Sequence, residues 1–176
     1  MKMEKKFQLL AMMFVAALAF SACSDDDDNK GVVVPEAVSK ALTAKFPTAT
    51  NVEWEQKKSY FVADCRVDGK DKDVWFDAQA AWQLTETDIF WNDLPAAVQT
   101  AFEGGEYAAW KRDDIDMLEY PVQPVRYVIE VENGAMEYQL FYAENGNFLD
   151  KRDVSGDKDD THLPTDKWGT ADDLNL

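Results

Sequence analysis

A nine-residue segment occurs twice in this chain, 60 residues apart. Residues 34–42 (VPEAVSKAL) and 94–102 (LPAAVQTAF) share four identities, and their remaining apolar positions stay apolar. Each copy carries a proline where the first turn of a helix tolerates it, followed by apolar residues at i, i+3 and i+4. A chain made of two copies of one unit must form that unit twice. Each copy is therefore predicted to begin with an amphipathic helix.

Beyond each predicted helix, apolar residues recur at every second position, the spacing of half-buried antiparallel strands. Residues 60–67 place Phe61, Ala63, Cys65 and Val67 on one face, opposite Tyr60, Val62, Asp64 and Arg66. The first set is the more apolar and is expected to face the core. Asparagine–glycine pairs at 133–134 and 145–146 predict two-residue hairpin turns.

The predicted fold is α+β, with two tandem repeats of one helix and about four antiparallel strands, and with the helices packed on one face of the sheet. The repeats occupy residues 34–90 and 91–154, and residues 155–176 form a polar, irregular tail. Ala80 stands where the second repeat has Gly146, so the first hairpin is expected to be looser or differently shaped. Aromatic residues match between the repeats as Trp54 with Trp110, Tyr60 with Tyr127, Phe76 with Tyr142, and Trp82 with Phe148.

A proline-led helix, Trp54 at the first strand, Tyr60 at the second, and Phe76-Asp77-Ala78 before a turn and Trp82 together resemble the PepSY-like family of small exported bacterial domains. That family is related in fold to the beta-lactamase-inhibitor protein. The resemblance covers about residues 34–152 and rests on apolar and turn positions, so it implies a fold more specifically than an activity. In the inhibitor-like relatives the concave sheet face grips a partner enzyme, and the resemblance implies such a use here.

The N-terminal segment has the pattern of a signal peptide. Lys2, Lys5 and Lys6 precede a mostly apolar run over residues 7–20, and two small residues lie just before Cys23. The apolar run is shorter than the roughly 20 residues needed to span a bilayer. The segment resembles a bacterial lipobox, from which Phe20 departs, and this implies cleavage after residue 22 and acylation of Cys23. The alternative is an ordinary signal peptide with a coincidental cysteine.

An acidic tract follows the predicted acylation site, within a tether over residues 23–33. Its residues are Ser24, Asp25, Asp26, Asp27 and Asp28. Such a run of like charges must stay solvated. It resembles the export signal that directs certain Gram-negative lipoproteins to the outer leaflet of the outer membrane, which implies a surface location. A flexible tether facing the periplasm is the alternative.

Net charge restricts the partners. The whole chain carries −16, and removing residues 1–22, with three lysines and one glutamate, takes away +2 and leaves −18. Nucleic acid is therefore not an expected partner. Attachment to a membrane is expected through lipid alone, because an anionic membrane face repels the domain.

Few residues offer catalytic or metal chemistry. The one histidine, His162, lies in a polar tail that offers no rigid scaffold, so a hydrolytic triad is not expected. Cys65 sits at an inward strand position, where an inert buried thiol is expected. The spacing of these two residues does not match a zinc site, and the aspartates near residue 157 lack the EF-hand pattern. We therefore expect no enzyme activity, no metal and no cofactor.

The face of the sheet opposite the helices is the predicted binding site. If it stays open, Tyr60, Val62 and Trp75 point toward it, with Arg66 among acidic residues around them. Aromatic side chains within a polar rim are typical of protein interfaces. These four residues are the predicted contacts with a protein or peptide. The alternative for Trp75 is burial beneath a loop or the C-terminal tail.

Two functions remain open at this stage. The first is a non-enzymatic envelope lipoprotein that binds, and in one version inhibits, a protein or peptide. The second is a structural or accessory module of an envelope complex. An exposed aromatic patch on the open face would favour the first function, whereas a face sealed by residues 155–176 would favour the second.

Overall fold

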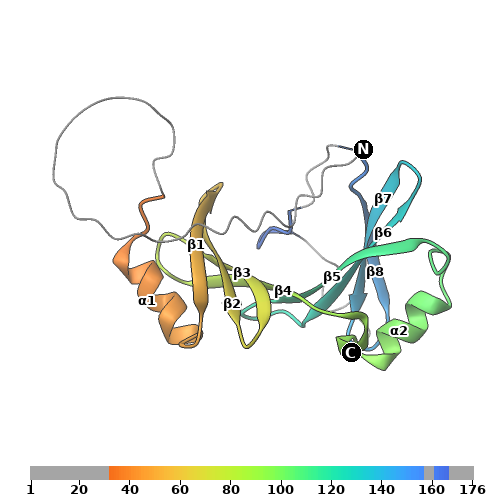
Figure 1. The fold of residues 1–176 in the computed structure, drawn as a ribbon, viewed down its shortest axis with the longest axis horizontal. Coiled ribbons are helices and arrows are strands. Elements are labelled where there is room, and N and C mark those ends of the chain that lie inside the picture. Colours follow the sequence, from red (N-terminus) through yellow and green to blue (C-terminus); the bar gives the residue numbers. More distant parts are fainter. Residues whose placement is uncertain (1–31, 157–160, 167–176) are drawn as a thin grey trace, which may run out of the picture. The chain divides into compact units, whose positions relative to one another are not determined.

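The computed structural model describes residues 32–156 and 161–166 of the 176-residue chain. Helix α1 (Glu36–Lys45) precedes strands β1 (Thr50–Lys57), β2 (Tyr60–Val67), β3 (Lys70–Phe76) and β4 (Trp82–Asp88). A short 3₁₀ helix η1 (Trp91–Asp93) and helix α2 (Ala96–Glu103) follow. Strands β5 (Lys111–Glu119), β6 (Arg126–Asn133), β7 (Met136–Ala143) and β8 (Phe148–Asp153) complete the order (Figure 1).

The eight strands form one antiparallel sheet in which each strand pairs with the next along the chain. The predicted α+β class and antiparallel pairing are confirmed. Strands β4 and β5 join the two halves of the sheet through four residue pairs, from Thr85 with Glu119 to Asp88 with Asp116. Because every neighbour in the sheet is also a neighbour in sequence, no crossover is needed, and η1 and α2 lie in the connection between β4 and β5.

Both α-helices begin directly after the prolines of the repeated segment, Pro35 and Pro95. Proline lacks an N–H, and the first N–H groups of a helix have no partner within the helix, so little is lost at this position. The predicted apolar stripes face inward: Val38 and Leu42 of α1 are buried. At ten and eight residues, the two α-helices of the described residues fall short of the length and apolarity that crossing a bilayer requires.

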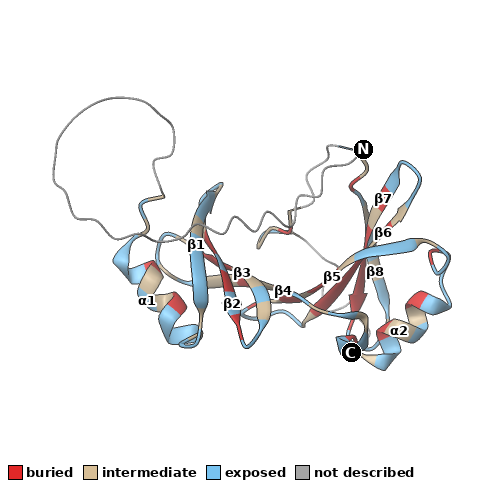
Figure 2. Ribbon diagram, viewed as in Figure 1, coloured by how far each residue is buried: buried red, intermediate tan, exposed pale blue. Residues whose placement is uncertain are grey.

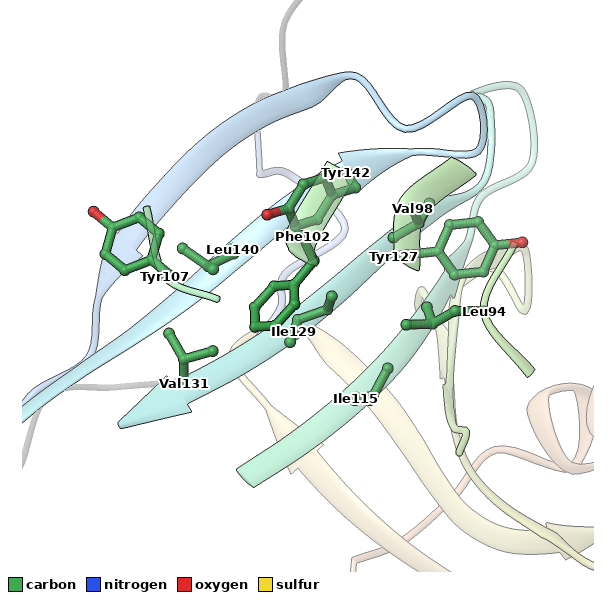
Figure 3. Close-up of a cluster of buried hydrophobic side chains, with 10 residues drawn as sticks. All are labelled: Leu94, Val98, Phe102, Tyr107, Ile115, Tyr127, Ile129, Val131, Leu140 and Tyr142. Carbon is green, nitrogen blue, oxygen red and sulfur yellow. The ribbon is translucent and has the colours of Figure 1, made fainter. Parts of the chain in front are cut away.

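Each helix covers its own cluster of buried side chains. The α1 cluster contains Val38, Leu42, Ala63, Cys65, Val67, Val74 and Phe76. The α2 cluster contains Leu94, Val98, Phe102, Tyr107, Ile115, Tyr127, Ile129, Val131, Leu140 and Tyr142 (Figure 3). Figure 2 shows the buried positions along the strands and exposed positions over much of the two helices. The predicted inward face of β2 is confirmed, because three of its four members are buried.

The two clusters lie on the same face of the sheet. Directly paired residues of neighbouring strands point to the same side. The register connects Ala63 with Val74, Val74 with Thr85, and Thr85 with Glu119. Ile115 lies on the same side of β5 as Glu119 and belongs to the α2 cluster. Both helices therefore cover one face, and the other face carries a third cluster that contains no helix residue.

Both predicted hairpins form, but neither has its two-residue turn at the predicted position. Asn133 pairs with Met136, so the two-residue turn contains Gly134 and Ala135 and lies one position later than predicted. Gly134 adopts φ +65, which glycine accepts without strain, and Asn133 remains in the strand. The predicted two-residue turn at 145–146 is wrong, because residues 144–147 all lie between β7 and β8.

Candidate functional site

The four predicted contact residues lie together on the sheet face opposite the helices, but half of them are buried. Val62 of β2 pairs directly with Trp75 of β3, and both side chains are 0% exposed. Tyr60 is half-buried, and Arg66 is exposed. The expectation that Val62 and Trp75 face solvent is therefore wrong, because an apolar cluster covers them.

This cluster, here called the open-face cluster, contains Val62, Trp75, Leu84, Leu118, Tyr120, Val128 and Phe141. Tyr60 packs edge-on to the Trp75 ring, with 5.9 Å between ring centroids. Leu163, from the C-terminal tail, also packs against the cluster. The structure therefore supports the alternative prediction, in which Trp75 is buried. The C-terminal tail packs against the same cluster through Leu163.

Residues 161–166, here called the docked segment, are fastened to β8 and β7. Arg152 donates from Nη2 to Asp166 Oδ2 at 2.6 Å and from Nη1 to the Thr161 carbonyl oxygen at 3.0 Å. The same Asp166 carboxylate accepts the backbone N–H of Leu163 at 3.0 Å. Charge-assisted hydrogen bonds of this kind are stronger than those between neutral groups. The segment is irregular, as expected, but it is packed in place.

His162 is the clearest departure from the sequence prediction. The absence of a scaffold in the tail suggested that nothing orients this residue, yet its side chain is 2% exposed. Its ring lies edge-on to Phe141, 5.7 Å between centroids, and Nδ1 is 3.2 Å from Glu86 Oε2. Leu163, an isolated apolar residue in the polar tail, is a sequence signal that could have indicated docking.

Acidic residues surround the exposed part of the face beside β1, β2 and β3. Asp64 is exposed at its outer end, and partial burial is the main reason that its pKa is raised, with the neighbouring carboxylate of Glu53 adding to the effect. Burial and the carboxylate of Glu86 raise the pKa of Asp73 to about 7. Lys57 opposes this shift, with its Nζ 3.7 Å from Asp73 Oδ2. The register places five carboxylates on this face beside two cations, Lys57 and Arg66, so acidic groups outnumber basic ones there; the five are Glu53, Glu55, Asp64, Asp71 and Asp73.

The structure brings two groups of potential metal ligands together within the described residues. One contains Glu86, Asp116 and His162, and the other contains Asp113, Glu130 and Glu137. Sequence reasoning found neither group, because the members of each come from different strands or from the tail.

The remaining candidates from the sequence are Cys65, the N-terminal residues and the aspartates of the tail. Cys65 is 2% exposed, and burial raises the pKa of its thiol, which disfavours the thiolate that a nucleophile needs. The predicted lipidation site Cys23 and the acidic tract Ser24–Asp28 lie outside the described residues, as do the aspartates at 157, 159 and 160.

Sequence and structure comparisons agree on the family. The family model described as beta-lactamase-inhibitor-like, PepSY-like matches residues 58–150, more than half of the chain. A BLIP-like protein from Bacteroides fragilis NCTC 9343 is 44% identical, with a TM-score of 0.73, over 80% of this chain and 99% of its own. No curated protein shows a significant match.

Two further solved structures are similar. A DUF2874 family protein from Bacteroides ovatus ATCC 8483 is 35% identical, with a TM-score of 0.72, over 77% of this chain and 97% of its own. A candidate periplasmic protein from Bacteroides eggerthii DSM 20697 is 30% identical, with a TM-score of 0.68, over 70% of this chain and 91% of its own. With this identity along nearly the whole length of these relatives, the chain belongs to the beta-lactamase-inhibitor-like, PepSY-like family.

Proposed function

We propose that this protein is a non-enzymatic, exported lipoprotein of the cell envelope that binds a protein or peptide through the sheet face opposite the helices. The observation that carries the proposal is the combination of an apolar cluster with an acidic, partly exposed surface on a face that neither helix covers. The family supports it, since one relative is BLIP-like. In one version of the proposal, binding inhibits the partner.

The contact residues need revision from the sequence prediction. Val62 and Trp75 form the floor of the site rather than its surface, because both are fully buried. Tyr60 and Arg66 remain candidates for direct contact, and the exposed carboxylate of Asp64 lies between them on β2. An aromatic side chain beside carboxylates suits a partner segment that carries lysine or arginine next to an apolar residue.

Photo-crosslinking tests the proposed face. A photoreactive amino acid at position 64 of the full-length chain, exposed to envelope extract, is expected to trap one protein that Tyr60→Ala reduces. The matched control is the same group at Lys40, whose side chain is 72% exposed on α1, the helix that packs on the opposite face of the sheet. Products that are equal from both positions, or unaffected by Tyr60→Ala, would contradict binding through this face.

A structural or accessory role in an envelope complex is the second candidate. It is favoured by the docked segment, because Leu163 packs on the same face and leaves less of it for a partner. Crosslinks that appear only after the segment is loosened by Asp166→Ala would support a covered face. Strong crosslinking of the wild type at position 64 would favour the binding function.

The location rests on the N-terminal residues. We propose that Cys23 is acylated and that Ser24, Asp25, Asp26, Asp27 and Asp28 direct the protein to the cell surface. The candidate periplasmic relative supports export in general. Cys23→Ala is expected to abolish fatty-acid labelling, whereas replacing the four aspartates with alanine should keep the label and remove protease accessibility in intact cells. Unchanged protease accessibility would indicate that the acidic tract is only a tether.

We also propose that the two halves of the domain are tandem repeats. Matching irregularities support the proposal. The register shifts between Trp75 and Phe76 where β3 pairs with β4, and between Phe141 and Tyr142 where β7 pairs with β8. The β1–β2 and β5–β6 pairs each contain a shift as well. In both, the first strand advances three residues while its partner advances two. Such bulges are retained as specific features of a unit.

A further inference from the structure

Glu86, Asp116 and His162 meet on the sheet face opposite the helices, although they are far apart in sequence. Glu86 pairs with Leu118, and Asp88 with Asp116, so Glu86 and Asp116 are diagonal neighbours on strands β4 and β5. His162 reaches them from the docked segment. One potential ligand atom of each residue lies within 4.8 Å of those of the other two.

The histidine separates this cluster from an ordinary acidic patch. Its side chain is 2% exposed, and within the described part of the chain neither ring nitrogen has a hydrogen-bond partner. Burial of polar atoms without such bonds costs free energy, which a ligand at the nitrogen would offset. The Nδ1 atom is nonetheless 3.2 Å from Glu86 Oε2, in an arrangement that lacks hydrogen-bond geometry.

A separation of this size is expected between two ligand atoms of one metal ion. Zn²⁺ holds an imidazole nitrogen and a carboxylate oxygen each at about 2.0–2.2 Å with tetrahedral angles, which places the two ligand atoms roughly 3.4 Å apart. The nitrogen also selects among metals, because Ca²⁺ and Mg²⁺ prefer oxygen ligands and imidazole suits Zn²⁺.

The charge and the burial of the two carboxylates also favour a bound cation. Asp116 is 5% exposed, and the Glu86 side chain is 19% exposed. Two carboxylates close together and largely removed from water repel each other, and a divalent cation between them removes that repulsion. We propose that Glu86, Asp116 and His162 form a zinc-binding site that joins the docked segment to β4 and β5. Three protein ligands leave a fourth position for water or for a group of a partner.

The site is held in shape by contacts that need no metal. Phe141 packs against the His162 ring, and Arg152 fastens the residues on both sides of it through Thr161 and Asp166. A histidine whose neighbours are fixed in this way loses less conformational entropy when it binds a metal. The proposed zinc site needs no protein or peptide partner.

The single histidine makes the test direct, because histidine-ring NMR signals of the full-length chain come from His162 alone. The untagged chain is treated with EDTA, dialysed and titrated with ZnCl₂, with calorimetry in parallel. We expect one equivalent of Zn²⁺ to bind and to shift the ring signals, and CaCl₂ to leave them in place. Glu86→Gln and Asp116→Asn should each lower the Zn²⁺ affinity at least about tenfold, and His162→Gln should abolish the calorimetric signal.

The matched control comes from the second carboxylate group, which has no histidine. Glu130→Gln removes a charge from that group and should leave the Zn²⁺ affinity unchanged. Circular dichroism of the metal-free variants checks the fold, and the two near-isosteric carboxamide variants decide the question if His162→Gln loosens the segment. The proposal is overturned if the wild type shows no saturable binding, if His162→Gln binds as well as the wild type, or if Glu130→Gln lowers the affinity as much as Glu86→Gln.

Discussion

Arg152 and Asp166 form the ion pair that attaches the C-terminal tail to the sheet, with Nη2 2.6 Å from Oδ2. Both side chains are largely buried, at 26% and 19% exposed, so solvent weakens this pair less than an exposed one. The pair has two consequences for function. It brings Leu163 to the open-face cluster, and it fixes the histidine between Phe141 and Glu86.

Loss of this ion pair should release the docked segment. Arg152→Ala removes hydrogen bonds to Asp166 and Thr161, and we expect it to lower the free energy of unfolding by about 1–3 kcal/mol. Modification of His162 by diethylpyrocarbonate should become faster in the variant, because the ring would be exposed. A modification rate equal to that of the wild type would mean that packing alone holds the segment. Lys40→Ala, on the exposed face of α1, serves as the control.

Trp75 should act as a core residue. Trp75→Ala is expected to lower the free energy of unfolding by about 3–5 kcal/mol, the usual cost of emptying the space of a large buried side chain. Urea unfolding measures this. Tyr60→Ala, at a half-buried position beside it, should cost less. A loss of under about 1 kcal/mol for Trp75→Ala would indicate a surface position instead.

The raised pKa of Asp73 should make stability depend on pH. The carboxyl titrates near 3.9 when unfolded and at about 7 when folded, so the folded state binds the proton more tightly. The stability that this carboxyl contributes to the folded state is fully present below about pH 4 and is lost as pH rises through 7. With the side chain 31% exposed, the loss should be about 2–4 kcal/mol.

Asp73→Asn provides the measurement for this pH dependence. The neutral amide cannot ionise, so the difference in unfolding free energy between variant and wild type should grow in favour of the variant from pH 4 to pH 8. Asp71→Asn, at an exposed position on the same strand, is the matched control and should give a difference that changes little with pH. A flat difference for Asp73→Asn would contradict the assignment.

Gly146 and Ala80 should respond oppositely to exchange. A Cβ atom at Gly146, where φ is +87, would lie 2.5 Å from the Ala97 carbonyl oxygen of α2, so Gly146→Ala should cost at least about 2 kcal/mol. Ala80 adopts φ +63 in the first hairpin, so Ala80→Gly should relieve strain and stabilise the fold by up to about 1 kcal/mol. Thermal unfolding of the two variants compares them, and a stabilising Gly146→Ala would be inconsistent with the close approach to α2.

Local pattern alone was enough to predict most of the architecture. The prolines at 35 and 95 and the i, i+3, i+4 spacing located both helices, because helix starts and apolar stripes depend on residues within one or two turns. Alternation along residues 60–67 assigned Ala63, Cys65 and Val67 to the core, since side chains of a strand alternate strictly between faces.

The covering of the second face was decided only by the tertiary structure. Alternation assigned Trp75 to that face correctly, but it carries no information about what packs there. Trp75 is buried in a cluster whose other strand residues come from β2 and from β4 to β7. The burial of His162 beside Glu86 likewise could not be predicted, because contacts such as the one between Arg152 and Asp166 leave no periodic signal in the sequence. The sequence by itself therefore determined the helices, the strands and their inward faces, through short-range periodicity. Long-range packing decided what covers the sheet and which charged groups meet on it.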